Sequence, residues 1–125
     1  MKYEVSDLQT LRAALDGFCS YLKMCDISEE SLFDSRLVVS ELAGNVLKHT
    51  RSSAVVEGEL VNGKIEVEVR SETPFRPPVR SALPDSVYAE NGRGLFLVDC
   101  ISEKRFFTPE GGIRVIVHTR YNTEK

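Results

Sequence analysis

Hydrophobic residues recur at helical spacing near the start of the chain. Five of them mark residues 8–24: Leu8, Leu11, Leu15, Phe18 and Leu22. Since residues three or four apart share one face of an α-helix, this stripe predicts a helix with a buried apolar side. Ser6, followed by Gln9 three positions later, is typical of a capping box at its start. No polar residue interrupts the stripe before Asp26 ends it, which indicates a structural helix.

A second, longer helix is predicted for residues 28–50. Its apolar face is formed by five residues: Leu32, Val39, Leu42, Ala43 and Val46. Ser28 is a suitable N-cap, and acidic residues follow in the first turn, where the helix dipole favours them. Glu41 and Asn45 are four residues apart, so they share one side of this helix at the edge of its apolar face. Such a pair usually belongs to a solvated face, but at this boundary it can also line a ligand pocket.

The second half of the chain carries the alternation that is typical of β-strands. Apolar residues alternate with charged ones at three positions: Ile65, Val67 and Val69. This pattern predicts a strand with one buried and one solvated face. The preceding Asn62-Gly63 pair suits a type I′ turn, so residues 52–60 should form its antiparallel partner. Residues 104–108 and 113–117 should form a second hairpin.

The region between the two hairpins has a different character. Residues 73–91 show no helical or strand period and hold four of the five prolines, so we expect a long loop that serves as a lid. Gly92-Arg93-Gly94 then precedes a helix predicted for residues 95–102. Glycines at a helix start let backbone N–H groups approach a phosphate, although a lone Gly-x-Gly more often reflects loop flexibility.

The order of these elements predicts an α+β fold. We expect a two-layer α/β sandwich, with helices packed on one face of a mostly antiparallel mixed sheet. The 125 residues suit one domain with one core, spanning residues 1–125.

Composition excludes several classes of function. A net charge of −3 argues against direct nucleic-acid binding and against an anionic membrane surface. We expect no membrane span and no signal peptide, because no apolar run has the required length. Three cysteines without a Cys-x-x-Cys pair favour reduced thiols in a cytoplasmic protein, each packed beside an apolar helical stripe: Cys19, Cys25 and Cys100.

Two motifs together resemble a known family. ELAGNVLKH, which contains Glu41 and Asn45, resembles the N-box of the GHKL (Bergerat-type) ATP-binding domains, and GRGLFLV resembles their second glycine box. The short chain and its ending GGIRVIVHTR are similar to the small anti-sigma-factor serine/threonine kinases. The resemblance covers nearly the whole chain and implies the Bergerat fold, ATP and Mg²⁺ as ligands, and a lid over the nucleotide.

The resemblance also implies roles for individual residues. Glu41 corresponds to the general base, which accepts a proton from a hydroxyl or water, and the Asn45 amide oxygen corresponds to the Mg²⁺ ligand. His49 ends the N-box, where it either contacts phosphate or caps the helix, and capping or packing is favoured. The second glycine box supplies four further nucleotide-binding positions: Gly92, Arg93, Gly94 and Leu95. Arg93 faces either phosphate or solvent, and Leu95, like Phe96, fits the core better than it fits adenine.

The first glycine box departs from the family pattern. Ser71 occupies the position of the Asp that accepts a hydrogen bond from the adenine amino group, and Thr73 occupies that of a Gly. A neutral acceptor makes a hydrogen bond of about half the strength of a charged one. Glu72 could substitute only after a slip by one residue, which would turn its side chain to the other face of the strand. We therefore expect weakened ATP binding.

Three functions follow from the resemblance. The first is an ATP-binding anti-sigma factor that phosphorylates an anti-anti-sigma partner on Ser or Thr and sequesters a sigma factor. The second is a partner-switching binding module of the same fold with weak or lost ATP binding, which Ser71 and Thr73 favour and Glu41 and Asn45 oppose. The third is a stand-alone relative of the sensor-kinase ATPase domains, and the absence of a dimerisation helix or phospho-acceptor segment argues against it. A homodimer is common among family members of this size.

Overall fold

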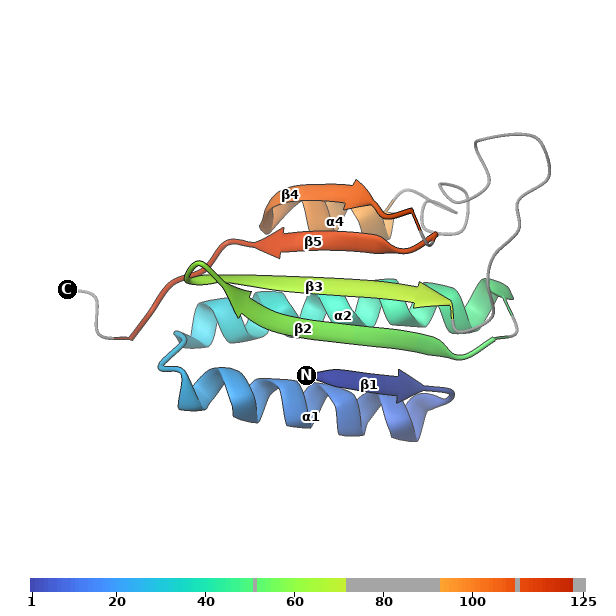
Figure 1. Cartoon of the computed structure of the whole chain (residues 1–125), viewed down its shortest axis with the longest axis horizontal. Helices are drawn as coiled ribbons and strands as arrows, with labels where there is room; N and C mark the ends of the chain where they lie inside the picture. The colour runs from blue at the N-terminus through green and yellow to red at the C-terminus, as the bar shows by residue number, and fades with distance from the viewer. Residues whose placement is uncertain (51, 72–92, 110, 123–125) are drawn as a thin grey trace.

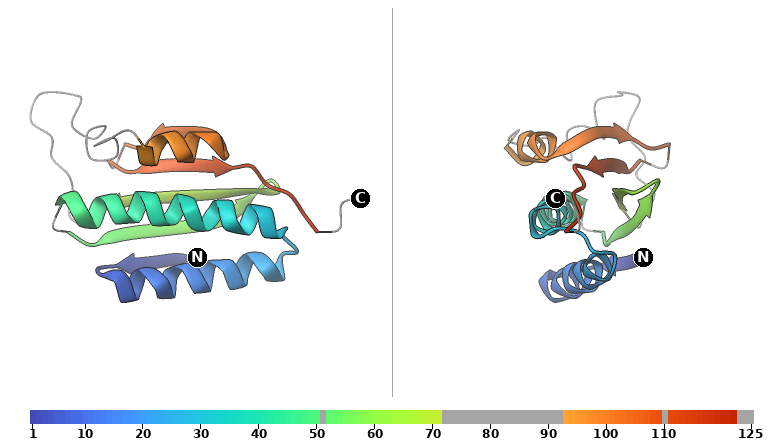
Figure 2. Two further views of the ribbon diagram at one scale, coloured as in Figure 1. Left: turned by 180° about the vertical axis from the view of Figure 1, so that it is seen from behind. Right: turned by 90° about the vertical axis from the view of Figure 1, so that its left-hand side faces the viewer.

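The computed structural model describes residues 1–50, 52–71, 93–109 and 111–122. In these parts, helices cover one face of a five-stranded sheet (Figure 1 and Figure 2). The elements follow one another in this order: β1 (Lys2–Val5), α1 (Leu8–Met24), α2 (Glu29–Thr50), β2 (Ala54–Val61), β3 (Lys64–Ser71), α4 (Arg93–Cys100), β4 (Ser102–Phe107) and β5 (Ile113–Val117). The predicted α+β class is confirmed. The loop expected at residues 73–91 lies outside the described residues.

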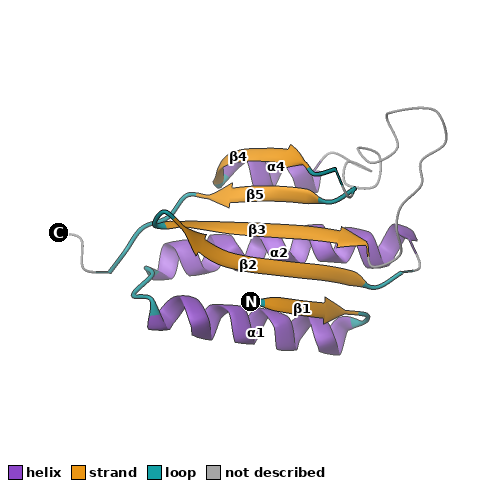
Figure 3. Ribbon diagram, viewed as in Figure 1, coloured by secondary structure: helices purple, strands orange, loops and turns teal. Residues whose placement is uncertain are grey.

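The strands lie in the order β1-β2-β3-β5-β4, and each neighbouring pair is antiparallel (Figure 3). Strands β3 and β4 are both antiparallel to β5, so they run in the same direction with β5 between them. We expected a mostly antiparallel mixed sheet, but no parallel pair occurs among the described strands. The parallel strands β3 and β4 are not neighbours, because β5 lies between them and is antiparallel to both. Strand β3 ends, and α4 begins, on the same side of the molecule (Figure 1).

The hydrophobic core lies between the sheet and the helices. Six residues of β3 and β5 are completely buried: Ile65, Val67, Val69, Ile113, Val115 and Val117. The predicted stripe of α2 packs against them, with Leu42 and Val46 also completely buried. Burial of each such side chain contributes about 1.5–3 kcal/mol, so this packing fixes how α2 sits on the sheet. No helix of the described residues is long and apolar enough to cross a membrane.

The start of α1 differs from the prediction. The N-cap is Asp7 rather than Ser6: Asp7 Oδ1 accepts a hydrogen bond from Thr10 N at 2.8 Å, and Thr10 Oγ1 accepts one from Asp7 N at 3.0 Å. The hydrogen bonds from Thr10 lower the pKa of the Asp7 carboxyl. Leu8 is 64% exposed, because side chains in the first turn point back beyond the helix start. The buried stripe therefore begins at Leu11.

Other local predictions also need correction. Cys19 is buried and Cys25 partly buried, but Cys100, the last residue of α4, is exposed. We expected a frayed tail from residue 121 onwards. Instead, Tyr121 Oη donates a hydrogen bond to the Gly63 carbonyl at 2.6 Å, and Asn122 Nδ2 donates one to the carbonyl of Ile27 at 3.1 Å. Residues 123–125 lie outside the described residues.

The start of α2 agrees with the prediction. Ser28 is its N-cap, since Ser31 N donates a hydrogen bond to Ser28 Oγ at 3.2 Å. Two serines, Ser31 and Ser35, then lie one turn apart on its buried face. The Ser31 hydroxyl donates to the His118 carbonyl at 3.0 Å and accepts from Arg120 N at 2.8 Å. The Ser35 hydroxyl has no hydrogen-bond partner within the described part of the chain.

We therefore expect opposite effects from two matched substitutions. Ser31→Ala should lower the free energy of unfolding by about 1–3 kcal/mol, because two partly buried backbone groups, the His118 carbonyl and the Arg120 N–H, lose their hydrogen-bond partner. Ser35→Ala should leave it unchanged or raise it by up to about 1 kcal/mol, since it removes an unsatisfied buried hydroxyl. Urea denaturation of the two variants and the wild type measures both changes in the free energy of unfolding, provided that the m-value stays the same. Equal destabilisation by the two variants would contradict the hydrogen bonding described for α2.

Candidate functional site

The C-terminal half of α2 carries the first group of predicted site residues. Leu42, Ala43 and Val46 are completely buried, whereas Glu41 and Asn45 are only partly buried. The polar pair lies where the buried face of the helix meets solvent, as the four-residue spacing predicts.

Among the described residues, no atom covers the helix surface at Gly44, beside this pair. Gly44 precedes Asn45, and a Cβ atom added to it would meet no atom within 4 Å among the described residues. Within the same part of the structure, the Glu41 carboxylate makes no hydrogen bond or ion pair. Its lone pairs are therefore available to accept a proton from a bound hydroxyl or water.

Helix α4 provides the opposite side of the site. It packs on α2 and runs antiparallel to it (Figure 1 and Figure 2). Its C-terminal end lies beside Asp34 in the first half of α2, so its first turn is directed towards the half that carries Asn45. The first backbone N–H groups of a helix have no partner within the helix and carry partial positive charge, which favours an anion there.

The second glycine box is only partly described. Helix α4 begins at Arg93, two residues earlier than predicted, and so includes Gly94 in its first turn. Gly92 lies outside the described residues, as do the side-chain positions of Arg93 and Leu95. Phe96 was expected in the core but is 64% exposed, whereas Val98, two residues later in α4, is completely buried.

Ser71 is the last residue of β3 and is partly buried. It is paired with Ala54, which is completely buried. Because Val67 and Val69 face the helices and side chains alternate along a strand, Ser71 is also on the helix-facing side. The register therefore needs no slip to bring Ser71 to the adenine position of the first glycine box. Glu72 and Thr73 lie outside the described residues.

These positions converge on one end of the molecule. The C-terminal half of α2, the first turn of α4 and the end of β3 all lie on the right in Figure 1. His49 is partly buried in the last turn of α2, and its contact with phosphate stays a prediction. The helix end next to it is held by Thr50, whose hydroxyl donates to the Val46 carbonyl at 2.7 Å and accepts from Ser52 N at 3.2 Å.

The residues present fit Mg²⁺ bound together with a nucleotide. No group of three His, Cys, Asp or Glu side chains is placed to hold a metal ion in the ranges that the structure describes. Mg²⁺ is typically held by one or two protein oxygens together with phosphates and water, so Asn45 on an open flank is a suitable ligand. In such a site the protein would supply the amide oxygen and the orientation, and the phosphates would supply most of the negative charge.

Comparison with known proteins agrees with this geometry. The family model of the histidine kinase-like ATPase domain matches residues 5–117, from the end of β1 to the end of β5. No curated protein sequence matches the chain. The family match covers α2, β3 and α4, the three elements that build the site, and it supports ATP binding of the GHKL type. On the strength of this match, the chain belongs to the histidine kinase-like ATPase family.

Proposed function

We propose that this protein is an ATP-binding anti-sigma regulatory factor with serine/threonine kinase activity. The observation that carries the proposal is the placement of Glu41 and Asn45. They lie one turn apart and partly buried on the half of α2 towards which the first turn of α4 is directed. A carboxylate that has no partner among the described residues, an amide oxygen and a helix N-terminus are together suited to phosphoryl transfer. The resemblance of the short chain to the anti-sigma kinases supports the finer assignment.

Each residue then has a defined task. Mg²⁺ and ATP, when bound, supply the phosphoryl group and neutralise its charge. Asn45 would hold the metal through its amide oxygen, and the backbone at the start of α4 would receive the phosphates. Glu41 would orient the hydroxyl of a Ser or Thr from the partner protein. It would accept the hydroxyl proton as the new O–P bond forms, while the bond from the γ-phosphorus to the bridging oxygen breaks and ADP leaves. Phosphorylation of an anti-anti-sigma partner would release it, leaving a sigma factor bound to this protein.

The alternative is a partner-switching module that no longer depends on ATP. Ser71 favours this alternative, because it lies on the helix-facing side of β3, where a carboxylate is expected in the family. Sigma and anti-anti-sigma proteins would be its partners as well, so partner binding does not separate the two functions. Homodimerisation is proposed for both.

Calorimetric titration with ATP and Mg²⁺ separates them. The kinase proposal expects binding in the micromolar range and transfer of phosphate to Ser or Thr of an anti-anti-sigma protein. The alternative expects no heat of binding and no thermal shift at millimolar ATP. Binding without any phosphoryl transfer would leave an ATP-responsive switch that is not an enzyme, which contradicts the kinase assignment.

Adenine recognition offers a gain-of-function test. Ser71→Asp should tighten ATP binding about tenfold, because a charged hydrogen bond contributes about 1.5–3 kcal/mol against about 1 for a neutral one. The wild type should also discriminate poorly between ATP and GTP, whereas the Asp variant should favour ATP. Addition of Thr73→Gly should increase the gain, since Gly lets the backbone approach the base.

Ser20→Asp is the matched control, because it adds the same charge at an exposed position of α1. Its ATP affinity should equal that of the wild type. Unchanged affinity in the Ser71→Asp variant and in the double variant would contradict the assignment of Ser71 to the adenine site.

A further inference from the structure

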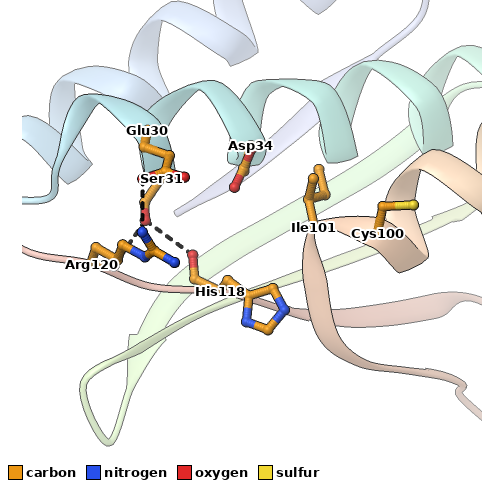
Figure 4. A pocket seen from close by; sticks show the side chains of 7 residues that line it. All are labelled: Glu30, Ser31, Asp34, Cys100, Ile101, His118 and Arg120. Atoms are coloured by element: carbon orange, nitrogen blue, oxygen red, sulfur yellow. Dashed lines mark hydrogen bonds and ion pairs between the residues drawn. The ribbon is translucent and has the colours of Figure 1, made fainter.

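A cavity lies where the C-terminal end of α4 meets the first half of α2. It has a volume of about 200 Å³ and is lined by Glu30, Ser31, Asp34, Cys100, Ile101, His118 and Arg120 (Figure 4). Asp34 precedes Glu41 by seven residues, which corresponds to about 10 Å along the helix axis. The cavity is therefore separate from the nucleotide site, although both lie beside the same two helices.

One wall of the cavity is fixed by hydrogen bonds and an ion pair. Ser31 is bonded to the backbone of both His118 and Arg120, as described above, and the Arg120 carbonyl accepts a further hydrogen bond from Ser28 N at 2.9 Å. Arg120 Nη1 lies 3.1 Å from Glu30 Oε1. This wall joins the start of α2 to the segment after β5, so the cavity is formed before any ligand arrives.

The Asp34 carboxylate has no comparable partner. It points from α2 into the space between Ser31 and Ile101 (Figure 4), and no hydrogen bond or ion pair joins it to another residue in the described ranges. Partial burial and the negative charge of Glu30 raise the pKa of Asp34, and the nearby His118 and Arg120 offset this only in part. At neutral pH, an ionised, partly buried carboxylate with a raised pKa destabilises the fold. Residues that destabilise the fold in this way are typical of binding and catalytic sites.

We propose that this cavity binds a small organic cation, an alkylammonium or guanidinium group, with Asp34 as its anchor. Because Glu30 is paired with Arg120, the Asp34 carboxylate leaves the described lining of the cavity with a net negative charge, which disfavours an anion. A metal ion is disfavoured because no three ligand side chains are grouped among the described residues. An ammonium or guanidinium head donates charge-assisted hydrogen bonds to the carboxylate, and a short alkyl stem packs on Ile101. The proposal is independent of ATP binding.

NMR titration of the ¹⁵N-labelled protein, without nucleotide, tests the proposal with butylammonium and methylguanidinium as probes. We expect saturable shifts in the amides of residues 30–34, 100–101 and 118–120, with a Kd of about 1 mM. Asp34→Asn should weaken binding at least tenfold, since it removes a charged hydrogen-bond acceptor. Asp16→Asn, the same substitution at an exposed position of α1, should leave the Kd unchanged, and butyrate and butanol should not bind.

The folded state of the Asp34→Asn variant is checked by thermal melting at pH 7. The variant should melt at or above the melting temperature of the wild type. The pKa of Asp34 is higher in the folded state than in the unfolded state, so at pH 7 the ionised carboxylate destabilises the fold, and the substitution removes this cost. Equal binding by Asp34→Asn and wild type, or equal binding of butyrate, would overturn the proposal. Shifts centred on residues 41–45 would also overturn it, because they would place the probe in the nucleotide site.

Discussion

A Glu41→Gln variant is expected to transfer phosphate about 10²–10⁴-fold more slowly than the wild type while binding ATP with nearly the same affinity. This range is the usual contribution of a general base. The amide preserves the size of the side chain but cannot accept the proton of the attacking hydroxyl. Because a base acts on the nucleophile rather than on the bound nucleotide, its loss lowers turnover more than affinity.

Single-turnover phosphoryl transfer and calorimetric ATP titration measure the two quantities separately. Glu29→Gln is the matched control, since it makes the same substitution in the exposed first turn of the same helix. It should transfer phosphate at the wild-type rate. If the wild type phosphorylates its partner and Glu41→Gln does so equally fast, then Glu41 is not the base, although the nucleotide site itself could still be correct.

An Asn45→Ala variant is expected to lose Mg²⁺-dependent nucleotide binding altogether while keeping its fold. Alanine removes the amide oxygen that holds the metal between protein and phosphates, and an octahedral Mg²⁺ ion tolerates the loss of a ligand poorly. Stability should change little, because Asn45 is only partly buried and alanine is a good helix former. ATP titrations with Mg²⁺ and with a chelator, together with a thermal melt, measure both effects.

Two further variants complete this experiment. Asn45→Asp keeps an oxygen ligand and should retain binding that depends on Mg²⁺, whereas Gln9→Ala removes an exposed amide from α1 and should behave as the wild type. Unchanged ATP affinity of Asn45→Ala in the presence of Mg²⁺ would remove Asn45 from the site. The Glu41 and Asn45 variants together separate catalysis from binding, so they also decide between the kinase and the binding module.

The sequence determined the features that depend on neighbours along the chain. The helical spacing of Leu42, Ala43 and Val46 is enough to bury one face of α2 and to place Glu41 and Asn45 at its edge. The alternation in residues 65–69 and the Asn-Gly turn before them are enough to specify the hairpin of β2 and β3. These predictions succeeded because the period of a helix or a strand is a local property of the backbone.

The tertiary structure decided the features that depend on which segments meet. Asp7 rather than Ser6 caps α1, and Phe96 is exposed to solvent. In both cases neighbouring residues are similar in type, and the packing of the whole helix decides which of them forms the cap or faces the core. Tyr121 and Asn122 are fixed by partners more than fifty residues away, which no local pattern reveals. The cavity around Asp34 is lined by residues of α2, the end of α4 and the segment after β5. These residues come together only when the long-range contacts of the fold have formed, so no local pattern in the sequence predicts the cavity.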